Sequence, residues 1–527
     1  MANRLPLLLL SLTAGLTLVT ACATAPKDVV KPAVEPVKAT AMNDAAPLTL
    51  PPLAQRVDQV DILHGQHVED PYRWLEDMSD ARTKTWTAAQ NDHARAHLAG
   101  IAGRDALTKR FNELFYVDAV SAPQRKGDRL FYTRRHKDKE KAIVYWRKAD
   151  DGAETVLIDP NTLSEDGSTS LGGWYPSRDG ALVAYTLKRN NADEATMYVR
   201  DVATGTDLRD VVGGAKYAYA AWTPDNSGFY YTYLPEGEDI PVADRPGFAE
   251  VRFHALGTEA KTDALVFPRL GDPEKFISPQ LSRDGKYLLL YVHHGWNSTD
   301  IFFKTLAKPD AVTAMPPLAG PTPPMGSAGW RSFNARMLGF KPLVDGVDAL
   351  FEVDIYKDRF YVLTNDQAAR YRVMRVDPKT PARKDWTEIV AESDATIESV
   401  SVLGGQLVLR ALKNASGDIE VRDLNGRLQH GVDLPSIGGV GGVVGNDDDD
   451  TAYFSFSSFT QPPEIHTLSV KSGATKPWAR IELPIDTTAF EITQVWYPSK
   501  DATKVSMFIV HRRGIPLDGS HPTLLYG

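Results

Sequence analysis

Three residue types that make up a hydrolase triad lie close together near residue 520: His511, Asp518 and Ser520. A nucleophilic serine needs a base within hydrogen-bond distance, a group that orients the base, and donors that stabilise the oxyanion. Residues 518–520 instead have the Asp-Gly-Ser composition of a connecting turn. No serine in the chain stands in a Gly-x-Ser-x-Gly setting. We therefore predict a turn here and assign no catalytic residue to the chain.

Histidine pairs and an acidic run are the candidates for a metal site. His64 and His67 lack a further ligand at a defined spacing, which favours a surface turn. His293 and His294 follow a strand-like run, where neighbouring side chains point to opposite faces. Residues 447–450 are four aspartates without the spaced ligands and closing glutamate of a calcium loop, so we predict a solvated connection. No metal site and no cofactor are predicted.

Two further groups of residues have a binding and a structural interpretation. The mixed-charge run at residues 134–141 could face a cavity and receive peptide carboxylates, but a solvated hairpin is the simpler reading. Trp174, Tyr175 and Trp222 could contact a ligand, but packing between blades is the favoured explanation. The structural interpretation is the one we adopt for both groups.

The N-terminal residues have the composition of a targeting segment. Arg4 precedes an apolar stretch at residues 5–19, which is short for a membrane span. Residues 19–22 read Val-Thr-Ala-Cys, which resembles a bacterial lipobox, so we expect a signal peptide at residues 1–21 and lipidation of Cys22. Cleavage nearby without lipidation is the alternative. Residues 22–52 are rich in Ala and Pro and predict a flexible tether.

The 527 residues carry 43% hydrophobic and 24% charged side chains with a net charge of −9, which is typical of a globular protein of two or more domains. The acidic balance argues against nucleic acid as a partner. Cys22 is the only cysteine, so an intramolecular disulfide is impossible. We expect a monomer in the bacterial periplasm, held at a membrane only through its lipid.

Residues 123–482 contain short strands separated by turns, with a weak internal repeat. Residues 176–185, 221–231 and 280–291 each combine a polar turn with an aromatic-rich strand, and residues 357–362 are a degenerate fourth copy. Repeated four-stranded units of about 50 residues predict a β-propeller. Seven blades fit the length, six or eight are also compatible with it, and a pair of β-sandwiches is the alternative fold.

The segments on either side of the repeats have different patterns. Residues 53–122 contain helical periodicity, clearest in Leu107, Phe111, Leu114 and Phe115. Residues 483–527 contain alternating strand patterns. We expect both segments to belong to one domain into which the propeller is inserted, and we expect residues 483–527 to be its first strands, with the remaining strands missing.

Several motifs resemble the prolyl oligopeptidase family of serine peptidases. They are residues 70–77 (DPYRWLED), 90–91 (QN), 159–167 (DPNTLSEDG), 497–501 (YPSKD), 507–511 (MFIVH) and 519–527 (GSHPTLLYG). The similarity covers about residues 58–527, and Ala502 stands where the family usually has glycine. The resemblance implies a seven-bladed propeller on an α/β-hydrolase domain, mainly β in this chain, and cleavage of short peptides after proline by a Ser-Asp-His triad.

The resemblance also implies that the triad and a tyrosine oxyanion donor lie beyond residue 527. We therefore expect this chain to be the N-terminal portion of such an enzyme and to be inactive alone. The other hypothesis is a lipid-anchored propeller that binds peptides or a protein partner without catalysis.

Overall fold

The computed structural model describes residues 50–149, 152–190, 192–236, 240–308 and 323–527. The signal peptide predicted at residues 1–21, Cys22 and residues 22–49 of the tether lie outside these described ranges. The chain forms two compact units, residues 1–107 and 108–527, and each is described by itself.

The first unit contains a hairpin of β1 (Val60–Leu63) and β2 (Gln66–Glu69), a short 3-10 helix η1 (Arg73–Glu76) and helix α1 (Ala81–Ala99). Trp74 is the buried anchor of this unit. Its indole donates to the carbonyl of Gln55 at 2.8 Å, and the Thr83 hydroxyl of α1 donates to the Trp74 carbonyl at 2.8 Å. Helix α2 (Arg104–Phe115) runs from this unit into the second. Across the described ranges, every helix is too short or too polar to cross a membrane.

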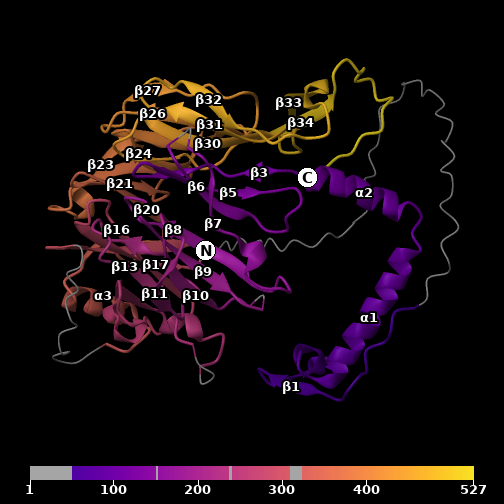
Figure 1. Ribbon diagram of the computed structural model, residues 1–527, viewed down its shortest axis with the longest axis horizontal. Coiled ribbons are helices and arrows are strands. Elements are labelled where there is room, and N and C mark those ends of the chain that lie inside the picture. Colours follow the sequence, from indigo (N-terminus) through magenta and orange to yellow (C-terminus); the bar gives the residue numbers. More distant parts are fainter. Residues whose placement is uncertain (1–49, 150–151, 191, 237–239, 309–322) are drawn as a thin grey trace. The chain divides into compact units, whose positions relative to one another are not determined.

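The second unit is a propeller of seven antiparallel sheets, which we call blades 1 to 7 in chain order (Figure 1). Blade 1 contains β3 (Ala119–Val120), β4 (Gln124–Lys126), β5 (Arg129–Arg135), β6 (Ile143–Lys148) and β7 (Thr155–Ile158). Blade 2 contains β8 (Ser170–Pro176), β9 (Leu182–Lys188), β10 (Ala195–Asp201) and β11 (Asp207–Val212). Blade 3 contains β12 (Ala221–Trp222), β13 (Gly228–Tyr233), β14 (Glu250–Ala255) and β15 (Ala264–Phe267). Blades 4 and 5 contain β16 (Lys275–Leu281), β17 (Tyr287–His294), β18 (Ser298–Thr305) and β19 (Lys341–Val344); and β20 (Phe351–Tyr356), β21 (Arg359–Thr364), β22 (Arg372–Val376) and β23 (Thr387–Val390). Blades 6 and 7 contain β24 (Thr396–Leu403), β25 (Gln406–Lys413), β26 (Ser416–Arg422) and β27 (Leu428–Gly431); and β28 (Gly439–Val440), β29 (Val444–Gly445), β30 (Thr451–Ser458), β31 (Gln461–Ser469) and β32 (Thr475–Ala479).

Two elements of this unit lie outside the four-stranded pattern. Helix α3 (Ala328–Met337) is inserted between the third and fourth strands of blade 4. After blade 7, β33 (Phe490–Pro498) and β34 (Lys504–Arg512) form a two-stranded hairpin. This hairpin contacts the propeller through Gln494, whose side chain donates to the Asn414 carbonyl at 2.7 Å, and through a Phe508–Phe459 ring contact.

The repeated turns predicted from the sequence join the first and second strands of their blades. In blade 2, the Asp179 carboxylate accepts from the Ser177 hydroxyl at 2.7 Å and from the Ala181 amide at 2.9 Å. Asp284 makes the equivalent bonds in blade 4. Gly180 has a φ of 72°, a left-handed conformation that glycine adopts without strain. The same hydrogen bonds recur in both turns, which confirms the predicted repeat. The sheet pairings show that the propeller has seven blades.

The hydrophobic core consists of seven clusters, one at each interface between neighbouring blades. Successive side chains of a strand point to opposite faces, and strands such as β13 and β17 are buried along most of their length, so both faces of a sheet contribute to a cluster. Trp174 packs in the cluster between blades 1 and 2, and Trp222 and Tyr175 pack in the one between blades 2 and 3. The prediction that these three side chains pack between sheets is confirmed.

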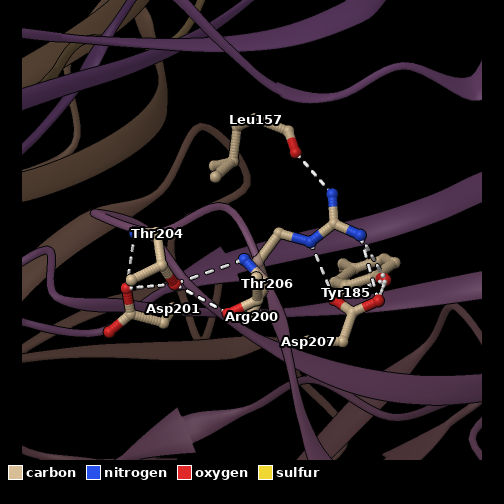
Figure 2. A network of polar contacts seen from close by, with 7 residues as sticks. All are labelled: Leu157, Tyr185, Arg200, Asp201, Thr204, Thr206 and Asp207. Atoms are coloured by element: carbon tan, nitrogen blue, oxygen red, sulfur yellow. Dashed lines mark hydrogen bonds and ion pairs between the residues drawn. The ribbon is translucent and has the colours of Figure 1, made fainter.

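Polar networks supplement this packing at the blade edges. Figure 2 shows Arg200 of β10, whose guanidinium forms a two-point ion pair with Asp207 at 2.7 and 3.0 Å and also contacts the Tyr185 hydroxyl. Its remaining terminal nitrogen donates to the Leu157 carbonyl of blade 1 at 2.6 Å. Because a guanidinium is a planar fork of donors, one side chain joins three strands of blade 2 to its neighbour.

In the described ranges every blade is built from strands that are consecutive in the sequence, so the first and last parts of the propeller do not share a blade. Trp478 of blade 7 packs its ring against Tyr132 of blade 1 and Tyr453 of blade 7, with centroids 5.4 and 5.9 Å away. Arg125 of blade 1 contacts the Tyr453 hydroxyl at 3.3 Å and Asp449 at 3.3 Å. Within the described ranges, these side-chain contacts join the first and last blades, which lie side by side in Figure 1.

Candidate functional site

The chain enters and leaves the propeller at one place, which we call the junction. Residues 116–118 lead into blade 1, and residues 480–484 follow blade 7. Both segments line a pocket of about 580 Å³, together with Glu113, Arg134 and Lys137. The two connections therefore run beside each other at one end of the blades, as expected for a propeller that is carried on another part of a protein.

The charged run at residues 134–141 lies beside this junction. Its backbone is fixed by the Lys137 amide, which donates to Asp118 at 2.8 Å, and by Arg135, which donates to the Phe115 carbonyl at 3.1 Å. Arg134 forms an ion pair with Glu154 at 2.6 Å. The run is thus a structured hairpin connection between β5 and β6, in agreement with the structural interpretation, and two of its cations line the junction pocket.

An aromatic surface crosses the first strands of three adjacent blades. Tyr219, just before β12, is edge-on to Tyr175 of β8 with ring centroids 4.7 Å apart. Tyr217 is edge-on to Phe276 of β16 at 5.8 Å. Tyr219 remains 58% exposed. Such rings offer apolar faces with polar tips, which suit contact with a peptide that contains both apolar side chains and backbone amides.

The structure does not assemble His511, Asp518 and Ser520 into a triad. His511 contacts the Arg512 carbonyl at 2.8 Å and Glu491 at 3.5 Å, both through Nδ1. The Asp518 carboxylate accepts from the Ser520 amide at 3.0 Å, which is the bond of a local turn. The predicted turn at residues 518–520 is therefore present.

The histidine pairs lie in an exposed hairpin and at the end of strand β17. His64, with a φ of 52°, lies in the turn between β1 and β2, and His67 is exposed on β2. His293 stacks on Tyr291, and burial lowers its pKa. His294 pairs with the buried Asp300. Within the described residues, no group of three or more potential ligands is placed to hold a metal ion.

Residues 447–450 form the connection between β29 and β30, where the Asp448 side chain is 76% exposed, but all four carboxylates also contact protein partners. Asp447 and Asp448 pair with Arg283 of blade 4, across the propeller. Asp449 pairs with Arg125 of blade 1, and Asp450 accepts from the Ser469 hydroxyl and the Lys471 amide. The connection lies where the first strands converge, so acids that look solvated in sequence meet cations from distant blades.

A buried cluster of charged residues between blades 2 and 3 was not predicted from the sequence. His254 of β14 is fully buried and lies between Asp210 and Asp263, at 3.0 and 2.8 Å. Burial disfavours its charge, but the hydrogen bonds and charges of the two carboxylates outweigh this and raise the pKa of His254. The three residues are spread over more than fifty positions and form no motif, so no local pattern indicates the cluster.

These features define a class of protein: a seven-bladed propeller that receives and returns its chain at a single junction. Residues 51–480 match the family described as prolyl oligopeptidase, N-terminal beta-propeller domain. The chain belongs to this family.

Curated relatives and solved structures agree with this assignment. The chain is 27% identical over 476 residues to a prolyl endopeptidase of Elizabethkingia meningoseptica, with 90% of this chain and 63% of the relative covered. It is 28% identical over 514 residues to prolyl oligopeptidase A of Galerina marginata, covering 90% and 66%. A structure from a study of two prolyl endopeptidases and their inter-domain dynamics superposes with a TM-score of 0.79 at 46% identity, covering 88% of this chain and 65% of that one.

The chain thus spans about two thirds of the length of these relatives. Prolyl oligopeptidase B of Galerina marginata, solved with a 35-residue hydrolysis and macrocyclisation substrate, has the same fold with a TM-score of 0.75 at 24% identity.

Proposed function

We propose that this chain is the propeller-bearing portion of a serine peptidase that hydrolyses short peptides after proline. The observation that carries the proposal is the family match over residues 51–480, together with relatives that are prolyl endopeptidases and of which the chain spans 63–66%. In this proposal the catalytic serine, aspartate and histidine belong to the remaining third of the relatives' length, and residues 1–527 do not hydrolyse peptides alone.

The junction supports a propeller inserted into a catalytic domain. Its two connections lie beside each other, so the flanking segments at residues 53–122 and 483–527 can both contribute to that domain. The exposed side chains of Trp496 and Tyr497 on the β33–β34 hairpin are consistent with a sheet that continues in a longer protein.

We also propose that the protein works in the bacterial periplasm, anchored through a lipid on Cys22. The lipobox-like residues before Cys22 support this part of the proposal. Radiolabelled fatty acid should be incorporated into the wild-type protein in cells and not into Cys22→Ser. Incorporation into Cys22→Ser would contradict the lipid anchor.

A fluorogenic peptide with proline before the cleaved bond tests the peptidase proposal. The chain of 527 residues should give no turnover above the blank that a serine-directed inhibitor removes. Fusing it to the catalytic portion of a prolyl endopeptidase relative should produce proline-specific turnover, and the same fusion with its catalytic serine changed to alanine is the matched control. Inhibitor-sensitive turnover by the 527-residue chain, or a folded fusion that cleaves without preference for proline, would contradict the proposal.

A further inference from the structure

The propeller contains a cavity of about 270 Å³ at the end of the blades opposite to the junction. Strand β5 shows the two ends: Arg135 lies beside the junction, whereas Arg129 follows the turn that begins at Lys126. Residues from six blades line the cavity, all from first strands or the turns that follow them: Lys126, Arg178, residues 280–283, 354–355, 401–403 and 445–447. We call it the mouth cavity.

Three cations from different blades meet in the mouth cavity. Arg283 of blade 4 pairs with Asp447 and Asp448. Arg178 of blade 2 has no carboxylate bonded to it and donates only to backbone carbonyls of Trp222, Leu281 and Ser282, at 2.8 to 3.3 Å. In the described ranges Lys126 of blade 1 has neither a hydrogen bond nor an ion pair from its ammonium group. Among the described residues Lys126 therefore has no counter-ion, and Arg178 is hydrogen-bonded to no carboxylate, although the charges of Asp284 and Asp447 act on it.

The pKa values of Lys126 and Arg178 are lowered, as expected for cations that are buried and lie close to other positive charges. Burial, together with the positive charges of Arg178 and Arg283, lowers the pKa of Lys126 to about 8. Burial and the charge of Arg283 lower the pKa of Arg178 to about 10. Both cations would gain from a negative charge placed between them.

Asp354 is one acid that lines the cavity, and its oxygens are bonded to the backbone rather than to either cation. The Asp354 carboxylate accepts from the Val402 amide at 2.6 Å and the Ile355 amide at 2.8 Å, so the backbone holds both of its oxygens. Burial raises the pKa of Asp354 to about 6. The other acid of the cavity, Asp447, forms an ion pair with Arg283.

We propose that the mouth cavity binds a small oxyanion, namely phosphate or the phosphate group of a larger molecule, between Lys126 and Arg178. Nε and Nη2 of Arg178 already donate to carbonyls, so the guanidinium would donate to the anion from Nη1, and the lysine adds a mobile positive charge. At about 30 Å³ for each water of liquid density, the cavity has room for a phosphate ion and several waters. This inference is independent of the proposed peptidase activity, because the cavity lies away from the junction.

Bound phosphate would act on the propeller as a whole. Arg178 already joins blade 2 to the backbone of blades 3 and 4, and Lys126 belongs to the blade that closes the ring. An anion between them would connect blades that share no strand. A ligand that binds only the folded state raises the stability of that state, so phosphate should raise the melting temperature.

The test is calorimetric titration of the 527-residue protein with inorganic phosphate, against sodium chloride at equal ionic strength. Phosphate should bind at one site with an affinity that chloride does not match. Lys126→Met should weaken binding by about tenfold or more, since it removes a charge-assisted hydrogen bond. Lys148→Met is the matched control: this lysine lies on β6 of the same blade with its side chain 74% exposed, and its loss should leave binding unchanged.

O-phosphoserine distinguishes the two sources of the ligand. Binding as tight as that of inorganic phosphate would support a phosphate group on a larger molecule, and weaker binding would support the free ion. Absence of phosphate binding to the wild-type protein would overturn the proposal without recourse to any variant. Undiminished binding by folded Lys126→Met would equally overturn it.

Discussion

The buried His254 cluster leads to a sharp prediction about stability. His254 is on β14 of blade 3, and its ring nitrogens contact Asp263 at 2.8 Å and Asp210 of blade 2 at 3.0 Å. The Tyr231 hydroxyl donates to Asp263 at 2.7 Å, and the Gly257 amide donates to Asp210 at 2.5 Å. With a carboxylate at each ring nitrogen, the charged imidazolium is the form that satisfies both.

Replacing His254 with phenylalanine keeps a flat ring but removes both donors. The two carboxylates then remain buried with one other hydrogen bond each. Removing one partner of a buried ion pair costs about 3–5 kcal/mol, so we expect His254→Phe to lose stability in this range at pH 6. Denaturant unfolding followed by tryptophan fluorescence measures the loss. The same substitution at the exposed His521 is the control and should change stability little.

The loss should depend on pH with a definite sign. Because the folded pKa of His254 is raised above the unfolded value of about 6.5, its charge stabilises the wild type fully below that pH. This stabilisation disappears as the pH rises through the folded pKa. The difference between wild type and variant should therefore shrink at alkaline pH. A loss below about 1 kcal/mol at pH 6, the size of an ordinary surface substitution, or a pH-independent difference would refute the reasoning.

Three further predictions concern the ring closure, one turn and the mouth cavity. Trp478→Ala should destabilise the protein by about 2 kcal/mol or more, because it removes the ring packed between blades 7 and 1; Trp296→Ala, at a side chain 94% exposed, is the control, and equal thermal stabilities would contradict the closure argument. Gly426→Ala should lower the free energy of unfolding more than Gly167→Ala does, as measured by denaturant unfolding. Both glycines have a positive φ, 87° at Gly426 and 70° at Gly167, but only at Gly426 would the new methyl lie 1.8 Å from the Ile389 carbonyl oxygen. The conformation alone costs about 1–2 kcal/mol, and similar losses for both variants would exclude the steric effect. Burial raises the pKa of Asp354 to about 6, above the unfolded value of about 3.9, so wild-type stability should fall by about 2 kcal/mol as the pH rises from about 4 to 6; Asp354→Asn should flatten this part of the profile, and an unchanged profile would show that another group controls it.

Much of the propeller could be predicted because its signals are local. Each Asp-Gly turn and the aromatic strand after it occupy about ten consecutive residues, and side chains of neighbouring residues make the bonds that define them. The same holds for the turn at residues 518–520, where Asp518 bonds to a residue two positions away. The family resemblance likewise rests on short contiguous motifs such as residues 70–77. Local chemistry needs no knowledge of the ring.

The blade count and the polar centres required the tertiary structure. The chain length allowed six, seven or eight blades, and the sheet pairings settle on seven. The Arg283–Asp447 pair joins residues 164 positions apart, and Lys126 and Arg178 meet only because first strands converge on one cavity. Charges in a sequence carry no information about which distant charges they will face. The sequence alone therefore determined the repeated unit and its family, whereas ring closure decided which acids are paired, which cations are bonded to no carboxylate, and where an anion could bind.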